Sequence, residues 1–287
     1  MTARRLPPHA YFAGSAAFHY LGPAFAVLLF ARVDALGVAW LRIASAAAVF
    51  AAWRRPWRAA GRLDRAGLRP LAAWGVVLAV MNCCFYAAIA RLPLATVAAI
   101  EFLPVVALAA LGARTPRNAL ALGLAAPGVY LLTGVRVEGE PVGVALAFAN
   151  AGLFALYIVL AHRAAEAGGR GSVPGIDALG AAMLVAAVAV TPLAGWAAAP
   201  ALGDPVALAA GAGVGISSSV IPYVLDQLAM ARLPRATYAL MVSLLPATAT
   251  VIGVAVLGQV PSPAEAAGVA LVIAGVALHR APAPPPG

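Results

Sequence analysis

A seven-residue segment of this chain occurs twice, about half the chain apart. Ala-Arg-Leu-Pro-Leu-Ala-Thr at 90–96 returns as Ala-Arg-Leu-Pro-Arg-Ala-Thr at 231–237, with six of seven residues identical at a spacing of 141 (231 − 90). Each copy follows an apolar segment and begins another that carries an internal proline, Pro104 or Pro246. Because similarity at a fixed spacing marks a duplicated structural unit, the two halves of the chain are expected to share one architecture.

The chain is too apolar for a soluble fold. Of its 287 residues, 63% are hydrophobic and only 10% are charged, against about 25% charged residues in soluble domains. Apolar runs of roughly 20 residues are long enough to cross the hydrocarbon core as helices. Ten such runs are present, at 10–30, 35–53, 67–90, 94–112, 118–134, 142–162, 177–197, 206–230, 236–257 and 263–279. The predicted fold class is an all-α membrane protein with ten transmembrane helices.

The ten runs divide into two groups of five. The first group occupies residues 1–134 and the second occupies residues 141–280, and the Pro/Ala-rich end at 281–287 is expected to be a disordered tail. Since five is an odd number, the second group enters the membrane from the opposite side, so the repeats are inverted. Inverted repeats around a central site are typical of secondary transporters. A duplication that only enlarged a helix bundle is the alternative.

The arginines predict the orientation in the membrane. The net charge is +9, and all nineteen basic residues are arginine. With the N-terminus in the cytoplasm, fifteen of them lie in cytoplasmic segments, and only Arg32, Arg91 and Arg136 lie outside. This asymmetry follows the positive-inside rule and predicts that both termini are cytoplasmic. The basic charge is therefore a topology signal with the lipid bilayer as its partner, and no nucleic acid is expected.

Two charged residues lie within predicted spans, where a charge costs roughly 2.5–3.5 kcal/mol on insertion scales. Arg42 and Glu101 each lie seven residues from the outer end of a run. Their similar depth makes an ion pair one interpretation. Alternatively, Arg42 could receive a substrate carboxylate, and Glu101 could carry a proton because burial favours the neutral carboxyl group. A buried pair that only fixes helix packing is the structural alternative.

Prolines and polar side chains indicate a central cavity. A proline inside a helix cannot donate to the carbonyl four residues earlier, so Pro104, Pro222 and Pro246 predict helix kinks. Freed carbonyls at membrane depth need protein or a wet cavity around them. Further candidate substrate-binding or coupling residues are Asn82, Tyr86, Phe102, Tyr157, Ser218 and Tyr223. His19 lies alone in its run, where a packing role is commoner than a proton relay.

Several functional classes lack their motifs. The chain has no Gly-rich phosphate loop of an ATP-driven motor. Its two cysteines, Cys83 and Cys84, have no histidine near them in the sequence to complete a metal site. No cofactor, metal or enzymatic reaction is therefore expected.

The residues also resemble a known family. The matching segments are Trp40-Leu41-Arg42, Met81-Asn82 with Phe85-Tyr86, Leu92-Pro93-Leu94 leading to Glu101-Phe102, and Ile221-Pro222-Tyr223 leading to Arg232-Leu233-Pro234. They are similar to the EamA branch of the drug/metabolite transporter superfamily and, more narrowly, to the bacterial inner-membrane threonine/homoserine exporters. The resemblance covers nearly the whole chain. It implies export of small polar metabolites, commonly amino acids, across a bacterial inner membrane.

One departure from the family leaves the substrate and the coupling ion open. The family often carries an acidic residue just before the ninth-span proline, whereas here Leu245 precedes Pro246. The first hypothesis is an exporter of amino acids such as threonine or homoserine, working by alternating access. The second is a multidrug or aromatic-compound exporter, and the third is a membrane structural or assembly protein that transports nothing. The oligomeric state is open, with a homodimer as one alternative.

Overall fold

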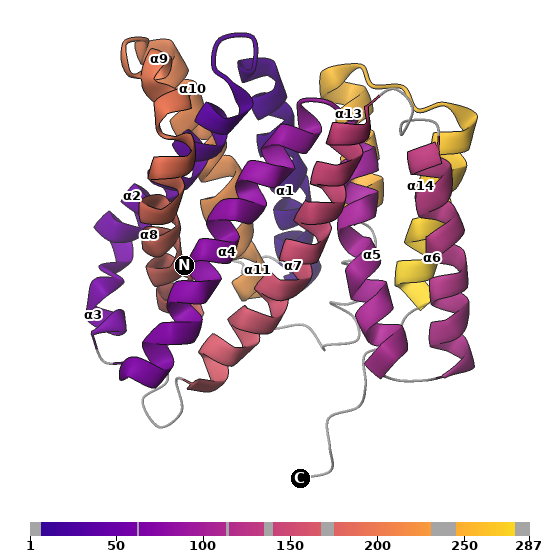
Figure 1. Cartoon of the computed structure of the whole chain (residues 1–287), viewed down its shortest axis with the longest axis horizontal. Coiled ribbons are helices and arrows are strands. Elements are labelled where there is room, and N and C mark those ends of the chain that lie inside the picture. The colour runs from indigo at the N-terminus through magenta and orange to yellow at the C-terminus, as the bar shows by residue number, and fades with distance from the viewer. Residues whose placement is uncertain are drawn as a thin grey trace.

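The chain folds into a bundle of helices (Figure 1). The computed structural model describes residues 7–61, 63–112, 115–134, 140–167, 175–230 and 245–278, and these ranges contain no strand. The longer helices are α1 (Pro8–Leu29), α2 (Ala35–Arg54), α4 (Arg65–Ile89), α5 (Leu94–Gly112), α6 (Pro116–Gly134), α7 (Pro141–Ala167), α8 (Gly175–Ala194), α10 (Pro205–Gly215), α11 (Ile221–Met230), α13 (Leu245–Leu257) and α14 (Pro263–Leu278). The short elements are α3 (Trp57–Ala60), η2 (Trp196–Ala198), α9 (Ala199–Leu202) and η3 (Ile216–Val220), a π-helical segment that joins α10 to α11.

The described helices follow the predicted apolar runs closely, and the all-α class is confirmed for the described residues. Six helical segments are long and apolar enough to cross a membrane, and three further apolar helices are shorter. Of the run at 236–257 only the part from residue 245 is described, while the second copy of the repeated segment and the tail at 281–287 lie outside the described residues. The number of spans, their inverted arrangement and the cytoplasmic termini stay predictions.

Local chemistry explains where many of the helices begin. Proline is the first residue of α1, α6, α7, α10 and α14, because its ring fixes a helical φ and its missing N–H would lack an intrahelical partner there. The side chains of Asp34, Asp64 and Asp204 accept hydrogen bonds from free N–H groups in the first turns of α2, α4 and α10. These caps mark helix starts within an otherwise uniformly apolar sequence.

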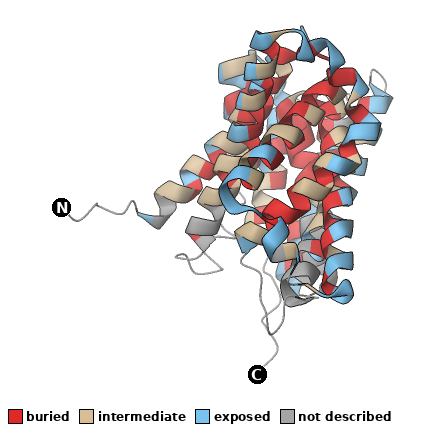
Figure 2. Ribbon diagram, turned by 90° about the vertical axis from the view of Figure 1, so that its left-hand side faces the viewer, coloured by how far each residue is buried: buried red, intermediate tan, exposed pale blue. Residues whose placement is uncertain are grey.

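The periphery of the bundle is apolar. Tyr130, Val188 and Val251 are 73%, 76% and 66% exposed, and Figure 2 shows exposed positions around the outside and buried positions toward the interior. Large exposed apolar surfaces are unusual on monomeric soluble proteins, whereas in a bilayer such side chains contact acyl chains. The surface therefore agrees with a multi-pass membrane protein.

The centre of the bundle is formed by helices from both halves of the chain. α4 packs against α7 and α8, and α2 packs against α8, α10 and η3. α1 contacts α10, η3, α11 and α13, while α5 contacts α6, α7, α13 and α14. On the other side of the bundle, α6 and α14 pack along each other (Figure 1). The six helices α1, α2, α4, α5, α7 and α11 enclose the central cavity described below.

Hydrogen bonds also join the first half of the chain to the second. Ser15 Oγ donates to the carbonyl of Pro222 at 3.2 Å. The backbone N–H of Leu94, the first residue of α5, donates to Gln259 Oε1 at 3.0 Å. This bond satisfies a donor that the start of a helix otherwise leaves without an intrahelical acceptor. A residue of the second half therefore completes a helix of the first half.

Glycines permit the closest approaches between helices. A Cβ atom on Gly128 of α6 would lie 2.8 Å from the carbonyl oxygen of Gly268 of α14, and the reverse contact has the same distance. A Cβ atom on Gly215, at the end of α10, would overlap Ser45 Oγ of α2 and lie 2.6 Å from the carbonyl oxygen of Arg42. The backbone of α2 beside Arg42 therefore touches the backbone that leads into the π-helical segment.

We expect Gly215→Ala to destabilise the protein, because the added methyl group must displace α2. Overpacking of this kind costs about 1–3 kcal/mol, which would lower the midpoint of thermal unfolding in detergent by several degrees. Gly213→Ala, two residues earlier in α10, is the matched control because a Cβ atom there meets nothing within 4 Å. Equal unfolding midpoints for the two variants would contradict the close contact between α10 and α2.

Candidate functional site

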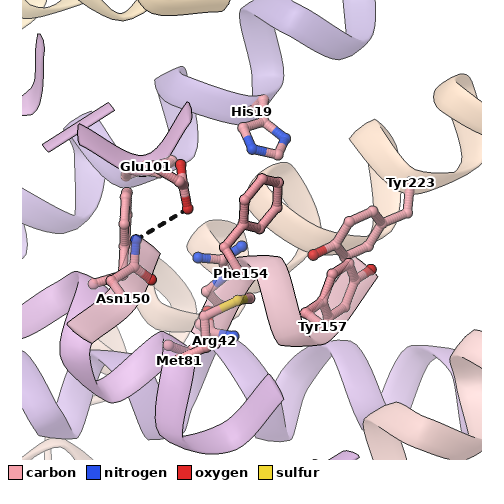
Figure 3. Close-up of a pocket in the computed structure, with 11 residues that line it drawn as sticks. His19, Arg42, Met81, Glu101, Asn150, Phe154, Tyr157 and Tyr223 are labelled. Atoms are coloured by element: carbon pink, nitrogen blue, oxygen red, sulfur yellow. Dashed lines mark hydrogen bonds between the residues drawn. The ribbon is translucent and has the colours of Figure 1, made fainter. Parts of the chain in front are cut away.

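A small cavity of about 60 Å³ lies at the centre of the bundle (Figure 3). Of the eight predicted substrate-binding or coupling residues, five line it, namely Arg42, Asn82, Glu101, Tyr157 and Tyr223. The other three, Tyr86, Phe102 and Ser218, lie behind the cavity, and each of them contacts a lining residue. The structure thus brings the predicted set together around one space.

Arg42 of α2 is 7% exposed, and its guanidinium makes two hydrogen bonds and one contact with an aromatic ring. Its Nε donates to Ser219 Oγ at 3.0 Å, and its Nη2 donates to the carbonyl oxygen of Ser218 at 3.2 Å. The guanidinium carbon lies 5.4 Å from the centre of the Tyr86 ring, which is within the range of a cation–π interaction. The hydrogen bonds occupy two of the five guanidinium N–H groups, which leaves three donors for another acceptor.

The acceptors of Arg42 exist because the helix is irregular at this point. Ser218 and Ser219 lie in the π-helical segment η3, and such segments occur frequently at functional sites. Pro222 has no N–H, so the carbonyl of Ser218, four residues earlier, lacks its α-helical donor. Arg42 supplies a donor to this carbonyl from another helix. Pro222 therefore acts here through the carbonyl that it frees.

Glu101 of α5 is 7% exposed and faces the cavity. Its Oε1 accepts a hydrogen bond from Asn150 Nδ2 of α7 at 3.1 Å, drawn as the dashed line in Figure 3. Asn150 itself is fully buried, and its Oδ1 has no hydrogen-bond partner among the described residues. The buried carboxyl group is therefore oriented by a neutral amide.

Arg42 and Glu101 do not form the ion pair that their similar depth suggested. The ion pairs of the described residues are Arg32–Asp204, at 3.4 Å, and Arg54–Asp177, at 2.7 Å. Arg42 and Glu101 line the same cavity while each is bound by neutral groups. The direct ion pair is therefore wrong, and the substrate-binding and coupling roles of Arg42 and Glu101 stay predictions.

Aromatic side chains form another wall of the cavity. Phe154 and Tyr157 of α7 stack with their ring centres 6.1 Å apart and their planes 8° apart. Phe102 contacts Phe154 edge to face at 6.1 Å, and Trp74 supports Tyr157 at 5.6 Å. Phe102 therefore positions the lining ring of Phe154 and does not itself line the cavity.

The remaining predicted prolines occupy different settings. α5 continues through Pro104, and Pro246 lies buried in the first turn of the described part of α13, where its carbonyl accepts a hydrogen bond from Thr250 Oγ1 at 2.9 Å. The kinks predicted at these positions stay predictions. Leu245, which replaces the acid of the family pattern, packs against the apolar core.

Sequence reasoning missed six lining residues, His19, Pro23, Met81, Phe85, Asn150 and Phe154. The sequence favours packing for His19, and the structure places its ring at the cavity (Figure 3). Pro23 lies four residues after His19 and removes the α-helical donor of the His19 carbonyl. Asn150 could have been predicted from the sequence, since a polar amide inside an apolar run needs a hydrogen-bond partner within the membrane.

Comparisons with known proteins find transporters among the relatives of this chain. The model of the EamA-like transporter family matches residues 141–280. The chain is 32% identical over 256 residues to the threonine/homoserine exporter RhtA of Escherichia coli (strain K12), which covers 88% of this chain and 84% of the relative. It is also 32% identical over 241 residues to the threonine/homoserine exporter RhtA of Salmonella typhimurium (strain SL1344), which covers 83% of this chain and 79% of the relative.

A double-mutant cycle can test how Arg42 is held. We expect Arg42→Met and Ser219→Ala to show a coupling free energy of about 1–2 kcal/mol, because each removes the same charge-assisted hydrogen bond. The measurement is the free energy of unfolding by denaturant in detergent micelles for the wild type, both single variants and the double variant.

Ser217→Ala is the control for this cycle, since Ser217 Oγ donates to the carbonyl of Val214 in its own helix at 3.2 Å. Its coupling to Arg42→Met should stay below about 0.5 kcal/mol. Additive effects of Arg42→Met and Ser219→Ala would show that Ser219 does not hold the guanidinium.

Proposed function

This chain belongs to the EamA-like transporter family and is a membrane exporter, and from that premise we propose that it exports small amino acids across the inner membrane of a bacterial cell. Relatives that are 32% identical over most of the chain are named threonine/homoserine exporters, so these two amino acids are the first candidates for its substrate. The observation that carries the proposal is the central cavity. It contains a buried arginine and a buried glutamate that do not bond to each other.

Arg42 is the proposed site for the substrate carboxylate. Three of its five N–H groups have no hydrogen-bond partner among the described residues. A guanidinium with free N–H groups matches the two oxygens of a carboxylate by paired hydrogen bonds. A charged residue inside a membrane is costly and often marks a substrate pathway. A bound substrate carboxylate would neutralise the buried charge of Arg42.

The size of the cavity favours a small substrate over a drug-like one. Sites for drug-sized ligands have volumes of about 300–1,000 Å³, whereas this cavity measures about 60 Å³. The aromatic wall of Phe154 and Tyr157 suits the apolar part of an amino acid as well as an aromatic drug. A multidrug exporter of the same fold is therefore the second candidate, and a structural protein without a transported solute is disfavoured by family membership.

Alternating access between two inverted repeats, residues 1–134 and 141–280, is the proposed mechanism. The pattern of helix contacts supports it. α1, the first helix of the first repeat, packs on α10, α11 and α13 of the second repeat, and α7, the first helix of the second repeat, packs on α4 and α5 of the first. Asn82 and Tyr223, which are 141 residues apart like the two repeated segments, both line the cavity. The family match at 141–280 coincides with the proposed second repeat. Two related halves around one site offer two equivalent packings, one open to each side.

Glu101 is the proposed proton carrier. Glu101 shares the cavity with the ionisable side chains of Arg42 and His19, and Tyr20 of α1 lies close enough to interact with it electrostatically. A proton on Glu101 would neutralise its negative charge. Binding of a proton and binding of the substrate would then be alternatives at one site, so that one is exchanged for the other. This coupling would drive export with the proton gradient.

We expect Glu101→Gln to abolish the dependence of transport on a pH gradient, because an amide side chain neither gains nor loses a proton near neutral pH. The measurement is threonine flux in proteoliposomes with and without an imposed gradient. Glu140→Gln is the control, since Glu140 is exposed just before α7, and it should keep the gradient dependence. Unchanged coupling in Glu101→Gln would remove Glu101 from the proton pathway.

We expect purified wild-type protein to be stabilised by threonine or homoserine and not by hydrophobic cations, because a ligand that binds the folded state raises its unfolding temperature. A thermal-shift screen against both classes is the measurement. Stabilisation by the cations alone would favour the multidrug candidate.

We also expect cells that produce the wild-type protein to hold less intracellular threonine and to release more into the medium than cells without it. Amino-acid pools measured in the two strains test this expectation. Equal pools would argue against export of threonine.

A further inference from the structure

Asn150 leaves one polar atom without a protein partner at the cavity. Its side chain is fully buried on α7, and its Nδ2 donates to Glu101 Oε1 at 3.1 Å. A carboxylate only accepts hydrogen bonds, so the amide must present its NH₂ group to Glu101 and direct its oxygen elsewhere. In Figure 3 this oxygen lies away from Glu101, on the side of Arg42. It has no hydrogen-bond partner within the part of the chain that the structure describes.

An orphaned buried acceptor requires an explanation, because nearly all buried polar groups are hydrogen-bonded. Asn150 lines the cavity together with Glu101, and within the described residues the only hydrogen bond of the Glu101 side chain is the one from Asn150. Asn150 therefore holds an acceptor without a partner, buried in the cavity wall beside the Glu101 carboxylate. A partner for this group must be a donor, and a cation suits it best.

We propose that Asn150 Oδ1 and the Glu101 carboxylate together bind the ammonium group of the substrate, while Arg42 binds its carboxylate. This inference rests on the proposed function and deepens it, because it assigns each charged end of an α-amino acid to a different part of the cavity. Asn150 thereby selects amino acids over carboxylates that lack the amine. It also makes the ammonium group and a proton compete for Glu101, which is the requirement for exchange of one against the other.

Three ligands of one carbon skeleton separate the contributions of the substrate groups. Threonine carries both the ammonium and the hydroxyl group, 2,3-dihydroxybutanoate replaces the ammonium by a hydroxyl, and 2-aminobutanoate lacks the side-chain hydroxyl. Their dissociation constants are measured by calorimetry on the purified full-length protein. Wild-type protein should bind the two amines more tightly than the dihydroxy acid.

Asn150→Leu removes the amide while keeping a similar volume. We expect it to weaken threonine and 2-aminobutanoate by about 10- to 100-fold, the range for a hydrogen bond to a charged group, and to change 2,3-dihydroxybutanoate by less than about 3-fold. Asn150→Ser, which keeps one small group able to accept a hydrogen bond, should retain part of the preference for amines and guards against a variant that fails to fold. Met183→Leu, a change of similar volume in the core of α8 and outside the cavity lining, should leave the ratio of the dissociation constants unchanged.

The outcomes separate the inference from the function on which it rests. Equal losses for all three ligands would overturn it, because Asn150 would then only position Glu101 or hold a water molecule. A loss confined to threonine would also overturn it and assign Asn150 to the side-chain hydroxyl. Wild-type protein that binds none of the three would overturn the amino-acid function and the inference with it.

Discussion

A guanidinium buried in a membrane must find its acceptors within the protein, and the way in which Arg42 finds them organises the centre of this bundle. Pro222 frees the carbonyl of Ser218, the π-helical segment presents Ser219 beside it, and Arg42 bonds to both. Gly215 lets α10 approach the backbone of Arg42 closely. These features hold α2 against α10 and the π-helical segment. Arg42 also lines the cavity.

Two of the predicted residues that line the cavity are charged side chains, which are costly to place inside a bilayer. Arg42 and Glu101 are conspicuous in the apolar runs because a charged side chain is unfavourable inside a bilayer. Both line the cavity. Tyr86, Phe102 and Ser218 contact lining residues but do not line the cavity. In helices that are apolar on every side, the sequence does not show which side faces the centre. The all-α class of the described residues followed from composition and run length, while the ten spans and their inverted arrangement stay predictions.

Other features depend on contacts between residues far apart in the chain, which periodicity does not encode. Asn150 and Glu101 are 49 residues apart and meet only because α7 packs on α5. The separation of Arg42 from Glu101 likewise depends on which acceptors the tertiary fold supplies. Depth in the membrane, which the sequence does indicate, predicts which residues lie at one level but not which of them touch. Helix-start residues such as Asp34 and Asp204 were readable because capping is a local interaction.

The hydrogen bonds between the two halves of the chain have a consequence for the way this protein is built. Gln259 completes the start of α5, Asn150 orients Glu101, and the carbonyl of Ser218 accepts from Arg42. In each case the group and its partner come from opposite halves. One half alone would therefore leave these polar atoms without partners inside a bilayer, which supplies no hydrogen bonds of its own. The two halves therefore depend on each other for hydrogen-bond partners at these three places.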